Sequence, residues 1–129
     1  MDNRADPTRG SVEDGLSTEV LDCDGVPAIV VAARGELDSQ TVPGLTAIVG
    51  DALSRPGVRC VVLDLDRIAF FGSAGVAFLT QADAEARARS VEFRLVVPPT
   101  SRVHRVLDVM GLTRLMALYP SRDEALAGL

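Results

Sequence analysis

Residues 59–89 read RCVVLDLDRIAFFGSAGVAFLTQADAEARAR, and this stretch decides the class of fold. It begins with an apolar run at 59–65, which is typical of a strand covered on both faces by other parts of the chain. A connection follows at 66–72, and residues 74–89 then have the periodicity of an amphipathic helix. A buried strand that leads into such a helix predicts a β-α crossover unit in a parallel sheet.

The alternation of strand and helix continues on both sides of this unit. On the N-terminal side, the turn Asp24-Gly25 predicts a hairpin between two short strands. The order β-β-α-β-α-β-α-β-α indicates an α/β fold with a mixed, mostly parallel β-sheet and helices packed on it. The remaining expected elements are strands at 16–21, 27–33, 91–97 and 115–118, and helices at 41–53, from Ser101 to a stop at Gly111, and at 121–126.

The length of 129 residues suits a single folded domain. Residues 1–14 are polar and contain Pro7, Gly10 and several charges, a composition typical of a flexible N-terminal tail. We therefore expect a tail at 1–14 and a folded domain at 15–129.

The composition excludes several classes of protein. The net charge is −5, all 13 basic residues are arginine, and no basic run occurs, so a direct nucleic-acid partner is not expected. Cys23 and Cys60 have neither a disulfide framework nor metal-ligand spacing around them, and they are expected to be small buried apolar residues. Neither a membrane span nor a signal peptide is recognisable, so we expect a cytoplasmic protein with no membrane partner.

Ser73 stands out because it opens a predicted helix between two glycines, Gly72 and Gly75. A serine in this place is usually an N-cap residue. It is also suited to be a phosphoacceptor, because free amides at a helix N-terminus can receive a phosphate and glycines allow another protein to approach closely. The two interpretations are compatible.

Catalysis by Ser73 is not supported by the surrounding residues. A hydrolase elbow needs glycine two positions before the serine, and that position is Phe71. The single histidine, His104, has arginine neighbours that indicate a solvated helix face. Asp64 and Asp66 are best read as solvated carboxylates at a strand end. We therefore expect neither an enzyme nor a bound cofactor or metal.

Three stretches carry a resemblance to the STAS family, which contains anti-sigma-factor antagonists and domains of sulfate transporters. They are RGELD at 34–38, VVLDL at 61–65 followed by IAFFGSAGVA at 68–77, and VLDVMGL at 106–112. Their order and spacing match the predicted elements across residues 16–126. The resemblance implies the STAS fold and a regulatory binding domain.

In that family, the serine after the phenylalanine-containing loop is phosphorylated by an anti-sigma-factor kinase. By position this serine is Ser73, and Asp38 matches an aspartate near the same surface. The resemblance implies partner switching: the unphosphorylated domain binds a histidine-kinase-like anti-sigma factor, phosphorylation ends the binding, and a serine phosphatase restores it. The implied partner-binding residues are Asp38, Ser39, Gly72, Ser73, Ala74 and Gly75.

The chain departs from the family pattern at two positions. Family members often have Asp directly before the acceptor serine, where this chain has Gly72, and many have a second hydroxyl residue after it, where this chain has Ala74. Ala74 leaves Ser73 as the one hydroxyl in the loop. Gly72 removes a carboxylate that a kinase would meet, which leaves open an alternative: a scaffold or ligand-sensing STAS domain without a phosphorylation cycle.

Overall fold

The computed structural model describes residues 8–13 and 15–129, and residues 8–13 only by their backbone. The strands and helices alternate after an N-terminal run of three strands. The strands are β1 (Thr8–Glu13), β2 (Leu16–Asp22), β3 (Ala28–Leu37), β4 (Cys60–Phe71), β5 (Glu92–Val96) and β6 (Ala117–Tyr119). The helices are α1 (Val42–Leu53), α2 (Ser73–Ala88), α3 (Arg102–Val109) and α4 (Arg122–Leu126).

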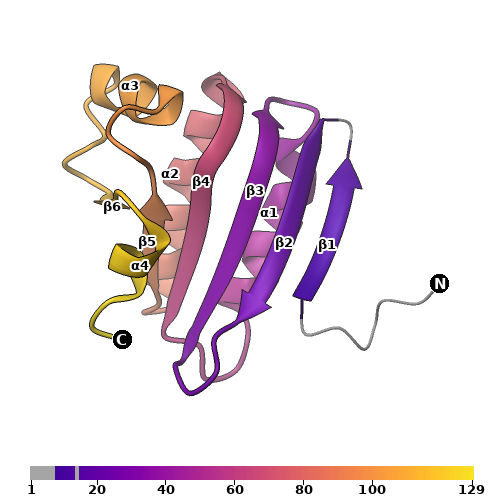
Figure 1. The fold of residues 1–129 in the computed structure, drawn as a ribbon, viewed down its shortest axis with the longest axis vertical. Helices are drawn as coiled ribbons and strands as arrows, with labels where there is room; N and C mark the ends of the chain where they lie inside the picture. The colour runs from indigo at the N-terminus through magenta and orange to yellow at the C-terminus, as the bar shows by residue number, and fades with distance from the viewer. Residues whose placement is uncertain (1–7, 14) are drawn as a thin grey trace.

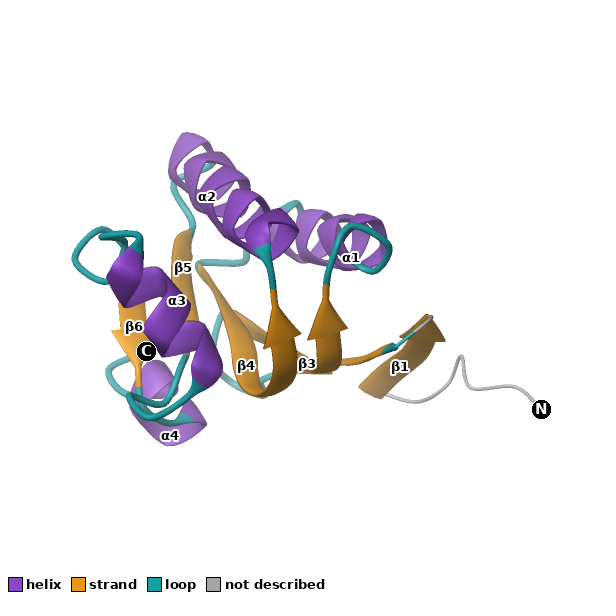
Figure 2. Ribbon diagram, turned by 90° about the horizontal axis from the view of Figure 1, so that it is seen from above, coloured by secondary structure: helices purple, strands orange, loops and turns teal. Residues whose placement is uncertain are grey.

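The strands form one sheet in the order β1-β2-β3-β4-β5-β6. The pairs β1-β2 and β2-β3 are antiparallel, and the pairs β3-β4, β4-β5 and β5-β6 are parallel. Figure 1 shows α1 and α2 behind the sheet and α4 in front of it, and Figure 2 shows the same layers from above. The predicted mixed α/β fold of mostly parallel strands is confirmed.

Strand β1 is a difference from the prediction, because its residues fall inside the expected flexible tail at 1–14. Residues 8–13 pair with β2 along their whole length, from Thr8 opposite Leu21 to Glu13 opposite Leu16. Edge pairing satisfies backbone groups and does not require an apolar sequence pattern, so the polar composition gave no signal for it. The other residues of the expected tail, 1–7 and 14, lie outside the described part of the chain.

Strand β4 is longer than predicted, because it continues to Phe71 and so takes up all but the last residue of the expected connection at 66–72. Its register against β3 shifts twice, between Ala32 and Arg34 and between Gly35 and Glu36 of β3, and each shift adds one residue to β4. Such β-bulges leave two successive side chains on the same face. Leu65, Ile68 and Phe71 consequently face the core at every third position, with exposed residues between them.

The main core lies between the sheet and the layer of α1 and α2, and it includes the inner face of α3. Most of its side chains are aliphatic, and Phe71, Phe78 and Phe93 are its aromatic members. Full burial of a Val, Leu, Ile or Phe side chain stabilises the fold by about 1.5–3 kcal/mol. A smaller apolar cluster on the opposite face lies under α4 and contains Ala28, Val30, Cys60, Val62, Val96 and Ala125.

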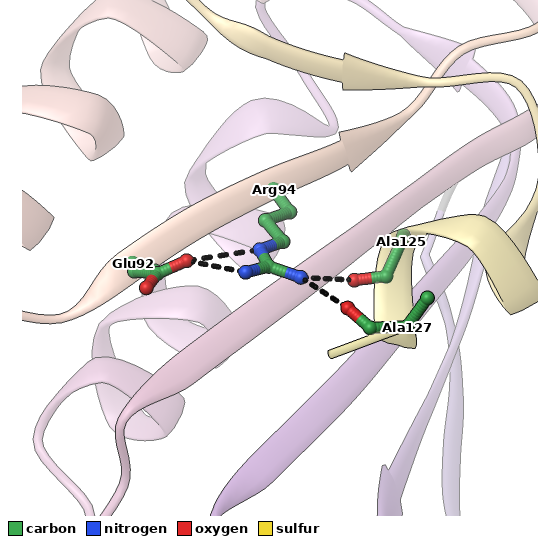
Figure 3. Close-up of polar contacts among 4 residues, drawn as sticks. All are labelled: Glu92, Arg94, Ala125 and Ala127. Atoms are coloured by element: carbon green, nitrogen blue, oxygen red, sulfur yellow. Dashed lines mark hydrogen bonds and ion pairs between the residues drawn. The ribbon is translucent and has the colours of Figure 1, made fainter. Parts of the chain in front are cut away.

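Helix α4 is held on that opposite face by two arginines. The Arg94 guanidinium donates to the carbonyls of Ala125 at 2.9 Å and Ala127 at 3.3 Å, and twice to Glu92 (Figure 3). Arg122 of α4 in turn forms an ion pair with Asp64 of β4, with a nitrogen–oxygen distance of 2.9 Å. Donors at the helix C-terminus satisfy carbonyls that have no partner inside the helix.

The two C-terminal helices, α3 and α4, both begin with a serine cap. The hydroxyl oxygens of Ser101 and Ser121 accept hydrogen bonds from the amides three residues later, at 3.1 and 3.2 Å, which is N-capping. Gly111 follows α3 with a φ of +73°, the left-handed conformation of a helix stop. Within the described residues, no helix has the length and apolar character needed to cross a membrane.

Candidate partner-binding site

The predicted site residues come from two loops that follow the adjacent parallel strands β3 and β4. Both loops leave the sheet at the same edge, where the carboxyl ends of parallel strands gather, and each leads into a helix (Figure 2). A backbone hydrogen bond of 3.2 Å from the amide of Gly72 to the carbonyl of Leu37 joins them. Asp38 and Ser73 follow directly after the two bonded residues, so the structure brings the two loops together.

The first loop, 38–41, is closed by its own side chains. The Asp38 carboxylate accepts hydrogen bonds from the amides of Gln40 at 2.9 Å and Thr41 at 3.0 Å. The Thr41 hydroxyl accepts from the amide of Asp38 at 3.0 Å and donates to the carbonyl of Glu36 at 2.7 Å. Thr41 is only 1% exposed. This network fixes the start of α1 and leaves Ser39 exposed and Asp38 half-buried.

The second loop, at Gly72–Gly75, has no such network. Gly72 is the N-cap residue of α2 in an extended conformation, and no side chain caps this helix. Ser73 is the first residue of the helix itself, so the interpretation of Ser73 as the N-cap is wrong. Its side chain is exposed, and its hydroxyl has no hydrogen-bond partner in the described part of the chain.

Gly75 is in the site for a steric reason. A Cβ atom added to Gly75 would lie 2.7 Å from the ring of Phe71, closer than a side chain tolerates. Phe71 is 5% exposed and belongs to the main core, so its ring packs directly on the backbone of the first turn of α2. Glycine at 75 thus sets the distance between the end of β4 and the helix that carries Ser73.

Phe70 is a surface residue next to this site that the sequence analysis did not assign to it. Its side chain is 48% exposed, and its ring lies 3.1 Å from the position that a Cβ of Gly72 would occupy. The Phe70 ring therefore lies against Gly72, the residue before Ser73. The sequence feature that could have indicated an exposed Phe70 is the spacing of apolar residues in β4, where every third residue from Leu65 to Phe71 faces inward.

The electrostatic environment of Ser73 favours a negative group. The first amides of a helix have no partner inside the helix and form its positive end. The first turn of α2 contains no acidic residue that would already occupy this end. A phosphate on the Ser73 oxygen would therefore be close to free amide donors and could form charge-assisted hydrogen bonds with them.

Other residues with reactive side chains take no part in this site. His104 lies on α3, and its imidazole makes no hydrogen bond to any described residue. Burial raises the pKa of the Cys60 thiol from 9.0 to about 11, which keeps it protonated. Asp64 was expected to be solvated, but it is 9% exposed and paired with Arg122, because a residue of α4 reaches over it.

Comparison with known proteins agrees with this geometry. The chain is 29% identical over 103 residues to the anti-sigma F factor antagonist of Paenibacillus polymyxa, covering 78% of this chain and 86% of the relative. The crystal structure of an anti-sigma factor antagonist from Mycobacterium paratuberculosis has a TM-score of 0.73 and 33% identity, covering 90% and 95% of the two chains.

The fold also matches SpoIIAA, an anti-sigma factor antagonist solved in its unphosphorylated form. The TM-score is 0.68 at 23% identity, and the match covers 84% of this chain and 92% of SpoIIAA. The family model of the STAS domain matches residues 18–125, a range that contains both loops of the candidate site, strands β3 to β6 and most of β2. The chain therefore belongs to the STAS domain family.

Proposed function

We propose that this protein is an anti-sigma-factor antagonist whose binding to an anti-sigma-factor kinase is ended by phosphorylation of Ser73. The observation that carries the proposal is the exposed, unpartnered hydroxyl of Ser73 on the first turn of α2. The names of two relatives, the antagonists of Paenibacillus polymyxa and Mycobacterium paratuberculosis, support the type of partner. Binding of the anti-sigma factor would release the sigma factor and so regulate the transcription that depends on it.

The proposed partner surface consists of the loop after β3 and the start of α2, with Phe70 at its border. Ser39 and Ser73 offer exposed polar contacts, Ala74 is half-buried, and the 48% exposed ring of Phe70 offers apolar area. Interfaces combine an aromatic anchor with polar groups in this way. The closed network around Thr41 keeps the first loop rigid, so little conformational entropy is lost when it binds.

The proposed switch acts at the centre of this surface. The kinase transfers the γ-phosphoryl group of ATP to the Ser73 oxygen, which loses its proton, and ADP leaves. The phosphate adds about −1.5 to −2 charges. The amides of α2 stabilise the phosphate in the free domain, whereas a bound partner would have to desolvate it. A difference of about 3 kcal/mol would weaken binding by roughly 100-fold. A serine phosphatase hydrolyses the phosphoserine and restores the hydroxyl.

The test is the intact mass of the protein after incubation with ATP and each histidine-kinase-like anti-sigma factor of its source organism. Wild type, Ser73→Ala and Ser39→Ala are compared, because Ser39 is an exposed serine in the neighbouring loop and serves as the matched control. We expect one added phosphate on wild type and Ser39→Ala and none on Ser73→Ala. The phosphorylated protein should no longer bind the kinase in a pull-down.

A second function has two observations in its favour. Gly72 stands where family members often have Asp, and the domain also has a polar cavity away from Ser73. A STAS domain that senses a ligand or acts as a scaffold would bind its partner stably without being phosphorylated. Stable binding with no mass change under ATP would select this function. No binding to any such kinase would overturn both.

A further inference from the structure

A cavity of about 330 Å³ opens on the sheet face that α1 and α2 do not cover. It lies over β2, β3 and β4, and a residue of α4 forms one wall. Its position on the opposite face separates it from the main core and from the start of α2. The charged side chains that line it are Glu19, Arg34, Asp64, Asp66, Arg67 and Arg122.

The first bulge of β4 places two arginines next to each other in this cavity. Ala32 pairs with Asp64, and after the register shift Arg34 pairs with Arg67. Without the extra residue, Asp66 would stand opposite Arg34 and give a favourable cross-strand pair. Like charges directly opposite each other on adjacent strands destabilise a sheet. The bulge therefore replaces an attractive arrangement by a repulsive one.

The carboxylates of the cavity do not neutralise this arginine pair. Asp64 is occupied by Arg122, at 3.0 and 2.9 Å, and by the amide of Asp66 at 3.0 Å. Among the side chains of residues 15–129, neither Arg34 nor Arg67 has an ion pair or a side-chain hydrogen bond. Two guanidinium groups with all their donors unused thus line one cavity.

We infer that this cavity binds a small molecule through a single carboxylate or phosphate group held between Arg34 and Arg67. Guanidinium groups bind both anions through paired hydrogen bonds of matching geometry. The cavity lining carries three positive and three negative side chains, Glu19 and Asp66 included, so it suits one anionic group rather than a polyanion. The ligand's other polar groups would meet these two carboxylates as hydroxyl or amine donors.

The test follows the arginine side-chain Nε–H signals of the isotope-labelled full chain by NMR during titration. The probes are inorganic phosphate and, in a separate arm, acetate, each against chloride at equal ionic strength. Variants are Arg34→Gln and Arg67→Gln, with Arg59→Gln as the control, since Arg59 is exposed and does not line the cavity. We expect saturable shifts for wild type and Arg59→Gln, and affinity weakened by about tenfold or more in the other two variants.

A second readout, the melting temperature, distinguishes loss of the anion site from misfolding of a variant. Removing one charge of the repulsive pair should raise the melting temperature of Arg34→Gln in chloride, and the preferred anion should stabilise wild type but not this variant. The arm that saturates at the lower concentration identifies the anionic group. Shifts that do not saturate, or that persist unchanged in Arg34→Gln and Arg67→Gln, would mean an adventitious ion only and overturn the inference.

Discussion

The two loops that follow β3 and β4 start at the same edge of the sheet but are built in opposite ways. In the loop at 38–41, the side chains of Asp38 and Thr41 form four hydrogen bonds with backbone groups of the loop and of the end of β3. The loop at Gly72–Gly75 has no side-chain cap and leaves the Ser73 hydroxyl exposed. The first loop thus uses its polar groups for its own structure, and the second leaves a hydroxyl free for the proposed phosphorylation.

The comparison changes how Asp38 should be understood. The family resemblance implies a partner contact for Asp38, while in this structure its carboxylate already accepts two amides. Its first role is to set the geometry of the loop, and a contact with a partner would be made by a residue that is held in place. Ser73 has no competing structural role. Substitutions in the two loops should therefore separate stability from binding.

The largest effect is expected for Thr41→Val, which keeps the shape of the side chain and removes its hydroxyl. The amide of Asp38 and the carbonyl of Glu36 lose their partner in a place where Thr41 is 1% exposed. Leaving buried polar groups unpaired should lower the free energy of unfolding by about 2–3 kcal/mol. Urea denaturation followed by circular dichroism measures it.

Ser73→Ala is the matched control in the second loop, because it also removes one hydroxyl. We expect its free energy of unfolding to stay within about 0.5 kcal/mol of wild type, as for an exposed side chain. If Ser73→Ala were as destabilising as Thr41→Val, the contrast between the loops would be wrong, and Ser73 would have a structural role.

Gly75→Ala should give the next largest effect. The added methyl group would overlap the ring of Phe71, which is buried in the core and has little room to move. Overpacking of this kind should cost about 1–2 kcal/mol. Gly72→Ala is the control, because its methyl group would meet the exposed ring of Phe70, which can turn away. Equal loss of stability in the two variants would contradict this account of Gly75.

The fold could be predicted from sequence because each helix and buried strand has its own periodicity. The alternation from 59 to 126 predicted the parallel order, and Gly111 was correctly expected to end the helix before it. The sequence allowed either Thr100 or Ser101 to cap that helix, and the structure has Ser101. Strand β1 has no apolar pattern, so pairing to the edge of β2 was invisible in the sequence.

The candidate site could be predicted only in part. The glycines around Ser73 indicated a helix start, yet the same pattern did not show whether Ser73 is the cap or the first helical residue. The bulges of β4 break the period of two, so residues 66–72 resembled a connection. The pair Arg34 and Arg67 depends on the exact register between strands, which no local pattern reports.

Asp38→Ala removes the carboxylate from the first loop's network and leaves the Thr41 hydroxyl in place. The amides of Gln40 and Thr41 lose their acceptor, and loss of a hydrogen bond to a charged group costs about 1–2 kcal/mol, with the lower end expected in this half-buried loop. Asp38→Asn keeps an oxygen acceptor in the same place, and its loss should be less than half as large. Denaturation midpoints measure both. An equal loss in Asp38→Asn would show that the charge, rather than the hydrogen-bond geometry, holds the loop.

The smallest expected effect is a gain, and it belongs to the second loop. Ser73→Asp puts a negative charge at the first residue of α2, where no acidic residue stands in the first turn. Interaction with the positive helix end should raise the free energy of unfolding by about 0.5 kcal/mol. The gain should disappear at high salt, where screening removes the interaction of exposed charges.

Ala88→Asp is the control for this gain, since the same charge at the exposed C-terminal end of α2 should lower the stability. The sign of the change in unfolding free energy for Ser73→Asp bears on how the proposed phosphorylation of Ser73 would act. If Ser73→Asp is stabilised while its binding to the kinase is lost, the free domain tolerates the charge and only the complex rejects it. If Ser73→Asp is destabilised instead, a phosphate at this position would act by disturbing α2, and the loop would not be a site prepared for modification.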